Sequence, residues 1–247
     1  LCLNHLQSNE EYRRLASYWI GECYDKLDDQ RLVIETMNKA INQDSTIVDY
    51  YLKRADALFY EQELDRAEKD YRKIIDLEKE YAYYSLYRLG WIREMQERYN
   101  EALDYYNMSI LLKEDYAYTY MMKGSLLKDY FNDMDNATVA FKKCIELDNG
   151  ISEGTCKQYA YLALGDTEKA IEITDSILGM TANPGAYYDA ACIYSRMGER
   201  EKAVIYLEQA FKKGYKKFKH VLKDNDLDNI RNYSEFKKLL KYWMNRL

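Results

Sequence analysis

Residues 83–116 read YYSLYRLGWIREMQERYNEALDYYNMSILLKEDY, and this stretch decides the fold. Apolar residues recur three or four positions apart on both sides of the polar patch Gln96-Glu97-Arg98. That spacing predicts two amphipathic helices joined by a short turn. The same pattern recurs along the chain at a step of about 34 residues, which indicates a solenoid of stacked helix pairs.

Three positions of this pattern can be followed through six consecutive copies. The eighth position of the first helix is small in five of them and reads Gly21, Ala55, Gly90, Gly124, Gln158 and Ala191. An early position of the second helix is a small apolar residue throughout and reads Val33, Ala67, Ala102, Ala137, Ala170 and Ala203. Four residues later stand Met37, Tyr71, Tyr106, Phe141, Thr174 and Leu207. Small residues paired with large ones at helical spacing predict closely packed helix backbones.

This pattern resembles the tetratricopeptide repeat family, whose first helix carries Leu, Gly and Tyr and whose second carries Ala, an aromatic residue and Ala. The resemblance covers about residues 14–217 and implies an all-α, right-handed superhelical solenoid of about six helix pairs. The expected repeats are residues 14–47, 48–82, 83–116, 117–150, 151–183 and 184–217. Residues 1–13 are expected to end a preceding helix or repeat. The fifth repeat matches least, and we expect its first helix to be short.

The pattern changes after the sixth repeat. Residues 218–247 resemble the segment that follows the last repeat in many bacterial tetratricopeptide proteins, which implies capping helices over the apolar face of that repeat. The residues expected to make the inner contacts are Phe218, Leu222, Leu227 and Ile230. Ser234 is expected to cap the final helix.

Composition excludes several classes of protein. One Pro and ten Gly in 247 residues argue against a β-sandwich or barrel, and no apolar run is long enough to span a membrane. Five scattered cysteines predict free thiols in a reducing compartment, so we expect a cytoplasmic protein. His5 and His220 are far apart in sequence, which argues against zinc.

No catalytic motif, phosphate loop or cofactor motif is present, so we expect neither an enzyme nor a cofactor. Asp224, Asp226 and Asp228 alternate as in a calcium loop. However, Asn229 stands where such a loop needs its invariant Gly. We therefore expect no metal site there, and solvated carboxylates that cap helices.

The 27 tyrosines exceed what a core needs. The resemblance implies that first helices line a concave face, and its registers select an aromatic and acidic set of candidate binding residues. These are Tyr18, Glu22, Asp56, Phe59, Tyr60, Tyr84, Tyr87, Arg88, Trp91, Glu94, Tyr118 and Met121. Such a lining favours a segment with Lys or Arg beside apolar residues. The alternative is that these aromatic residues only pack against one another.

The leading functional hypothesis is a non-catalytic scaffold that binds a peptide or protein segment in this groove. An alternative is the repeat arm of a larger enzyme or regulator whose working domain lies upstream. Single-stranded nucleic acid is disfavoured because the chain carries a net charge of −6. Only the basic tail, with eleven Lys or Arg against four Asp or Glu in residues 211–247, supports nucleic-acid binding. A homodimer through exposed solenoid ends is a further possibility.

Overall fold

The computed structural model describes residues 10–26, 29–148 and 156–246, and every regular element in these ranges is a helix. The all-α expectation is therefore confirmed. The chain forms two compact units, Leu1–Gln96 and Glu97–Leu247. The boundary lies in the turn of the stretch 83–116, so its two helices belong to different units.

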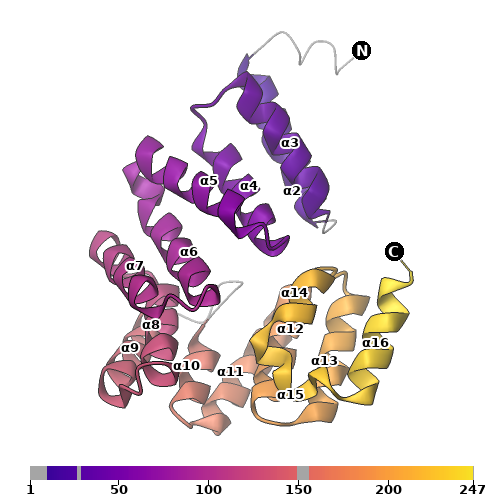
Figure 1. Cartoon of the computed structure of the whole chain (residues 1–247). Coiled ribbons are helices and arrows are strands. Elements are labelled where there is room, and N and C mark those ends of the chain that lie inside the picture. Colours follow the sequence, from indigo (N-terminus) through magenta and orange to yellow (C-terminus); the bar gives the residue numbers. More distant parts are fainter. Residues whose placement is uncertain (1–9, 27–28, 149–155, 247) are drawn as a thin grey trace. The chain divides into compact units, whose positions relative to one another are not determined.

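The first unit consists of consecutive helices, each packed on the one before (Figure 1). They are α2 (Glu10–Lys26), α3 (Gln30–Gln43), α4 (Val48–Tyr60), α5 (Leu64–Leu77), the short 3₁₀ helix η1 (Lys79–Tyr81) and α6 (Ala82–Met95). The expected repeat boundary at residue 14 falls inside α2, which begins at Glu10. Residues 1–9, the rest of the predicted preceding helix, lie outside the described residues.

The second unit also consists of helices packed in pairs. Its repeat helices are α7 (Tyr99–Leu112), α8 (Ala117–Asp129), α9 (Met134–Leu147), α10 (Lys157–Ala163), α11 (Thr167–Met180), α12 (Pro184–Arg196) and α13 (Arg200–Lys212). The C-terminal segment consists of α14 (Phe218–Lys223), η2 (Asn225–Leu227), α15 (Asp228–Arg231) and α16 (Ser234–Met244). The helix α10 has seven residues, so the expected short first helix of the fifth repeat is confirmed.

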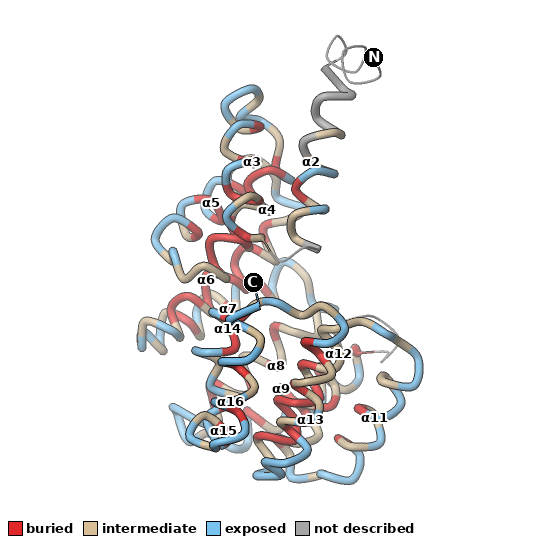
Figure 2. The backbone as a smooth tube through the Cα atoms, turned by 90° about the vertical axis from the view of Figure 1, so that its right-hand side faces the viewer, coloured by how far each residue is buried: buried red, intermediate tan, exposed pale blue. Residues whose placement is uncertain are grey.

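The repeating small positions are the closest helix contacts, as the spacing predicts. All six early positions of the second helices have an exposed fraction of 1% or less. A Cβ atom built on Gly124 would lie 2.6 Å from Cε1 of Phe141, and one on Gly21 would lie 2.7 Å from Cε of Met37. A side chain at position 124 would therefore push the paired helices apart, whereas one at position 21 would require the flexible end of Met37 to move. Buried residues accordingly follow the facing sides of paired helices such as α12 and α13 (Figure 2).

The turn inside the repeat uses a left-handed residue five positions before the inward Ala of the second helix. These residues are Gln62 (φ 64°), Glu97 (φ 60°), Asn132 (φ 52°), Gly165 (φ 85°) and Gly198 (φ 81°). Left-handed backbone is unstrained for glycine and costs other residues about 1 kcal/mol. The repeated turn therefore explains the two glycines and stores a small strain at the three other positions.

The C-terminal segment packs its apolar side chains against α12 and α13 in one continuous core. Phe218, Leu227 and Ile230 point inward as predicted, but the prediction for Leu222 is wrong. Leu222 is 43% exposed and Val221 fills the core, because α14 presents the preceding residue to α13. Ser234 is the first residue of α16 and donates to Oε2 of Glu235, so it does not cap that helix.

Candidate functional site

Two candidate groove residues of the first unit, Tyr84 and Arg88, contact the carboxylate of a third, Asp56, in α4. Tyr71, from α5, donates its hydroxyl to Oδ1 of Asp56 at 2.6 Å, and the hydroxyl of Tyr84, from α6, lies 3.1 Å from both carboxylate oxygens. Nη2 of Arg88 lies 3.1 Å from the same Oδ1. Two consecutive helices, α5 and α6, therefore supply these partners of one carboxylate in α4.

Arg88 lies at the centre of a set of five aromatic rings. The distances from its guanidinium carbon to the ring centroids are 4.9 Å for Phe59, 5.2 Å for Tyr84, 5.4 Å for Trp91, 5.9 Å for Tyr60 and 5.9 Å for Tyr87. Each distance lies within the range of a cation–π contact. We call Asp56, Arg88 and these five rings the Arg88 cage.

The charge in the cage is balanced internally. Nε of Arg88 donates to the hydroxyl of Tyr84 at 2.8 Å, and Tyr84 in turn donates to Asp56. Burial alone would lower the pKa of Arg88, but attraction to Tyr84 and Asp56 outweighs burial and raises it, so the guanidinium stays protonated. The pKa of Tyr71 is raised well above its ordinary value by burial and by Asp56, so Tyr71 remains a donor.

These contacts change the expected character of the groove. The side chain of Arg88 is 7% exposed, and Phe59 and Tyr87 are buried. Tyr60, Tyr84 and Trp91 remain half-exposed at the rim. The carboxylate of Asp56 already has a cation of this chain beside it, so it does not await a basic residue from a partner. What the cage offers outward is aromatic surface.

The remaining predicted residues are placed separately. Glu22, in α2, forms an ion pair with Lys53, whose Nζ also lies 5.4 Å from the ring of Tyr18. Glu94 is half-buried near the end of α6. Tyr118 and Met121 belong to α8 of the second unit, where Met121 is buried in the core around Phe141 and Tyr118 packs at its edge.

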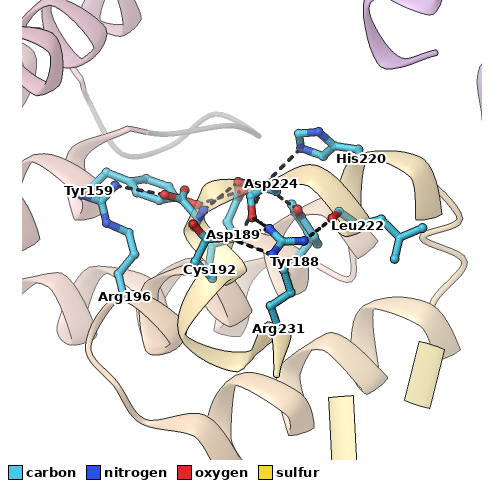
Figure 3. Close-up of polar contacts among 11 residues, drawn as sticks. Tyr159, Tyr188, Asp189, Cys192, Arg196, His220, Leu222, Asp224 and Arg231 are labelled. Atoms are coloured by element: carbon cyan, nitrogen blue, oxygen red, sulfur yellow. Dashed lines mark hydrogen bonds and ion pairs between the residues drawn. The ribbon is translucent and has the colours of Figure 1, made fainter. Parts of the chain in front are cut away.

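A second polar cluster was not predicted, and it lies in the second unit (Figure 3). Asp189 and Cys192 of α12 face Asp224 and Asp226, which belong to the segment after α14. A signal for it is present in the sequence. In the sixth repeat, Ala191 occupies the position that Gly90 occupies in the third. Asp189 precedes Ala191 by two residues, as Arg88 precedes Gly90, and Cys192 follows Ala191 directly, as Trp91 follows Gly90. We call these four residues the Asp189 cluster.

Two of the carboxylates in the Asp189 cluster, those of Asp224 and Asp226, form hydrogen bonds or ion pairs with neighbouring side chains. Asp224 accepts from the hydroxyl of Tyr188 at 2.5 Å and lies 3.3 Å from Nε2 of His220. Asp226 forms an ion pair with Arg196 at 3.2 Å. The hydrogen bond to Asp189 is weaker, since Oδ1 accepts from the hydroxyl of Tyr159 at 3.4 Å. The expectation of solvated carboxylates is therefore wrong for Asp224 and Asp226, which fold back against α12.

The three neighbouring carboxyl groups of the Asp189 cluster have different pKa values, because buried negative charges close together disfavour one another. Burial, with Asp226 and Asp224 nearby, raises the pKa of Asp189 from 3.8 to about 7. Burial and Asp224 raise the pKa of Asp226 to about 6. Burial would also raise the pKa of Asp224, but hydrogen bonds from His220 and Tyr188 hold it below its ordinary value. Asp224 therefore carries the charge, and Asp189 changes protonation near neutral pH.

The donor atoms of Cys192, Asp224 and Asp226 lie within 4.8 Å of one another, a spacing that a metal ion could bridge. The chemistry does not fit one. The carboxylate of Asp224 already accepts a hydrogen bond from Tyr188 and lies beside Nε2 of His220. Asp226 is also paired with Arg196. We therefore assign no metal to the Asp189 cluster.

Comparison with known proteins agrees with the repeat geometry. One sequence model of the tetratricopeptide repeat matches residues 48–81, 117–150 and 184–212, and a second matches residues 84–110. The chain is a tetratricopeptide repeat protein. A tetratricopeptide repeat protein from Parabacteroides merdae superposes with a TM-score of 0.59 at 16% identity, over 96% of this chain and 87% of that one. PilF of Pseudomonas aeruginosa superposes with a TM-score of 0.52 at 16% identity, over 93% and 97%.

A curated relative, a chloroplastic protein of Arabidopsis thaliana, is 37% identical over 81 residues. The match covers 31% of this chain and 24% of the relative, so the chain spans about a quarter of that protein's length. Among the described residues, no helix of this tetratricopeptide protein is long and apolar enough to cross a membrane. The cytoplasmic expectation stays a prediction.

Proposed function

We propose that this tetratricopeptide protein is a non-catalytic scaffold that binds a segment of a partner protein on the first-helix face of α4 and α6. The observation that carries the proposal is the Arg88 cage. Its rings are already ordered by one buried cation, and three of them keep half-exposed edges. Ordered aromatic residues make strong binding anchors because little side-chain entropy is lost when a ligand covers them.

The internal pairing of Asp56 with Arg88 also supports a particular kind of ligand. A basic ligand residue would compete with Arg88 for the same carboxylate. An apolar or aromatic ligand side chain instead gains contact with the rim formed by Tyr60, Tyr84 and Trp91 and displaces no existing ion pair. The proposed partner is therefore a segment with apolar anchors, and this replaces the expectation of a segment that carries Lys or Arg beside apolar residues.

The test is a selection of peptides from a random displayed library on the full chain, followed by calorimetric titration of the selected peptides. Trp91→Ala should weaken binding at least tenfold, because a central aromatic anchor contributes about 2 kcal/mol. Met95→Ala is the matched control, since Met95 is an exposed apolar residue of the same helix outside the cage. Selected peptides that bind Trp91→Ala as tightly as the wild type would place the binding surface elsewhere.

We also propose that the C-terminal segment closes the repeat array. Its support is the continuous core that Val221, Leu227 and Phe236 form with Leu207 and Ala210 of α13. That core covers the apolar face the sixth repeat would otherwise expose. A chain ending at residue 217 should therefore bind a dye for exposed apolar surface, and the full chain should not.

One observation supports the alternative hypothesis that this chain is the repeat arm of a longer protein. The curated relative extends well beyond the matched region, which is 24% of its length. The complete open reading frame tests it, since a frame without a second domain would exclude this alternative.

A further inference from the structure

Two buried cysteines meet between the fourth and fifth repeats. Cys144 lies in the last turn of α9 and Cys156 immediately precedes α10, with exposed fractions of 0% and 1%. Their sulfur atoms are 2.9 Å apart. A disulfide bond is about 2.05 Å long, so an approach of about 0.9 Å would join them.

Hydrogen bonds through Asp148 hold the two cysteines in this position. Oδ2 of Asp148 accepts from the backbone N–H of Cys156 at 2.6 Å and of Lys157 at 2.8 Å. The backbone N–H of Asp148 donates to the carbonyl of Cys144 at 2.9 Å. A single buried residue therefore connects the backbone of one cysteine to that of the other. The contact between the sulfur atoms is built into the junction.

The neighbouring thiol and burial together set the protonation of Cys156. Cys156 has its pKa raised far above the ordinary thiol value by its hydrogen bond with Cys144 and by burial. Cys156 therefore keeps its proton, and either sulfur atom of the pair can donate to the other. The other described cysteines have different surroundings, since Cys23 is exposed and the sulfur of Cys192 lies 4.0 Å from Oδ2 of Asp224.

We propose that Cys144 and Cys156 are a reversible disulfide site that cross-links α9 to the start of α10. The oxidant is a low-molecular-weight disulfide such as glutathione disulfide. Local opening of the junction exposes Cys144, which loses its proton, attacks one sulfur of the small disulfide and releases one small thiol. Cys156 then loses its proton, attacks Sγ of Cys144 and releases the second small thiol. Two protein thiols are oxidised, and one small disulfide is reduced to two thiols.

The cross-link acts on the junction between neighbouring repeats. The helix α9 is the second helix of the fourth repeat, and α10 is the short first helix of the fifth. A disulfide across 12 positions restricts the unfolded chain there and keeps the two helices adjacent. Oxidation should therefore stabilise the weakest-matching repeat, and reduction should release it.

The chain offers a direct measurement. Trypsin cleaves after Lys143 and Lys157, so both cysteines fall in one tryptic peptide, residues 144–157. The full chain is equilibrated in glutathione buffers of increasing oxidised fraction, quenched with acid, denatured, alkylated with iodoacetamide and digested. In oxidised buffer we expect this peptide without alkyl groups and lighter by two hydrogen atoms, and in reduced buffer with two alkyl groups. Two alkyl groups, or bound glutathione, across the whole range would overturn the proposal.

Thermal unfolding gives an independent readout. Oxidation should raise the Tm of the wild-type chain by roughly 5–10 °C, and Cys156→Ser should abolish that shift. Cys192→Ala is the matched control, because it removes a buried cysteine outside the pair and should retain the shift. An equal shift in Cys156→Ser would assign the stabilisation to another cysteine. If Cys156→Ser does not fold, the mass of the wild-type peptide still decides.

Discussion

Replacing Asp189 with asparagine should stabilise the second unit at neutral pH and leave it unchanged in acid. The pKa of Asp189 is 3.8 in the unfolded chain and about 7 in the folded one. A group whose pKa is higher in the folded chain contributes its full stabilisation below the unfolded pKa of 3.8. That contribution to the free energy of unfolding is lost as the pH rises through the folded pKa of about 7. A shift of about three pKa units corresponds to a penalty of at most about 4 kcal/mol above pH 7.

Asparagine removes this penalty because it cannot ionise and still accepts from Tyr159 through its amide oxygen. The groups facing residue 189 are Tyr159 of α10 and the carboxyls of Asp226 and Asp224. The pKa of Asp226 is itself raised by burial and by Asp224, with Arg196 opposing them. The pKa of Asp224 is lowered, so Asp224 acts oppositely and stabilises above pH 3.8.

The assay is thermal unfolding followed by circular dichroism at pH 4 and pH 8. A penalty of this size corresponds to an increase in Tm of several degrees, and at most about 10 °C, for the variant at pH 8. At pH 4 the two proteins should differ by no more than about 2 °C, because Asp189 is still protonated in the folded chain and the penalty is only about 0.6 kcal/mol. Asp104→Asn is the matched control, since Asp104 is exposed on α7 of the same unit.

A variant that is no more stable than the wild type at pH 8 would refute the reasoning. A gain of equal size at both pH values would refute it as well, because it would identify a packing effect and not a charge effect. Either result would mean that Asp189 is solvated or neutralised by a partner in the folded protein.

Two further predictions concern the repeat itself, and chemical denaturation measures both. Gly124→Ala should lower the free energy of unfolding by about 1–3 kcal/mol, because its Cβ would lie 2.6 Å from Phe141. Gly179→Ala should raise the free energy of unfolding by up to about 1 kcal/mol, because a Cβ there would meet no atom within 4 Å. Gln62→Gly should stabilise the chain by about 0.5–1 kcal/mol because residue 62 has a φ of 64°, and Lys69→Gly inside α5 should destabilise it by about as much. If both alanine variants changed the free energy of unfolding in the same direction, the role assigned to the Gly124 contact would be contradicted. If both glycine variants did so, the role assigned to the backbone at residue 62 would be contradicted.

The repeat could be predicted from the sequence because its contacts are local. Ala137 and Phe141 are four residues apart on one helix, and Gly124 meets Phe141 within the same repeat. Each repeat therefore contains the residues of its own packing contacts, and the recurrence of these residues in six repeats makes the pattern recognisable in the sequence. The one-residue error at Leu222 arose in the C-terminal segment, where no second copy of the pattern is available to set the register.

The sequence by itself determined the helices, their pairing and the candidate residues on the first-helix face. Only the tertiary structure decided which charges are already satisfied. Asp56 and Arg88 are 32 positions apart, and Asp189 and Asp224 are 35 apart, so no helical spacing relates them. A repeat pattern specifies the face on which a side chain lies, whereas its ionisation and its partner depend on what another repeat places beside it.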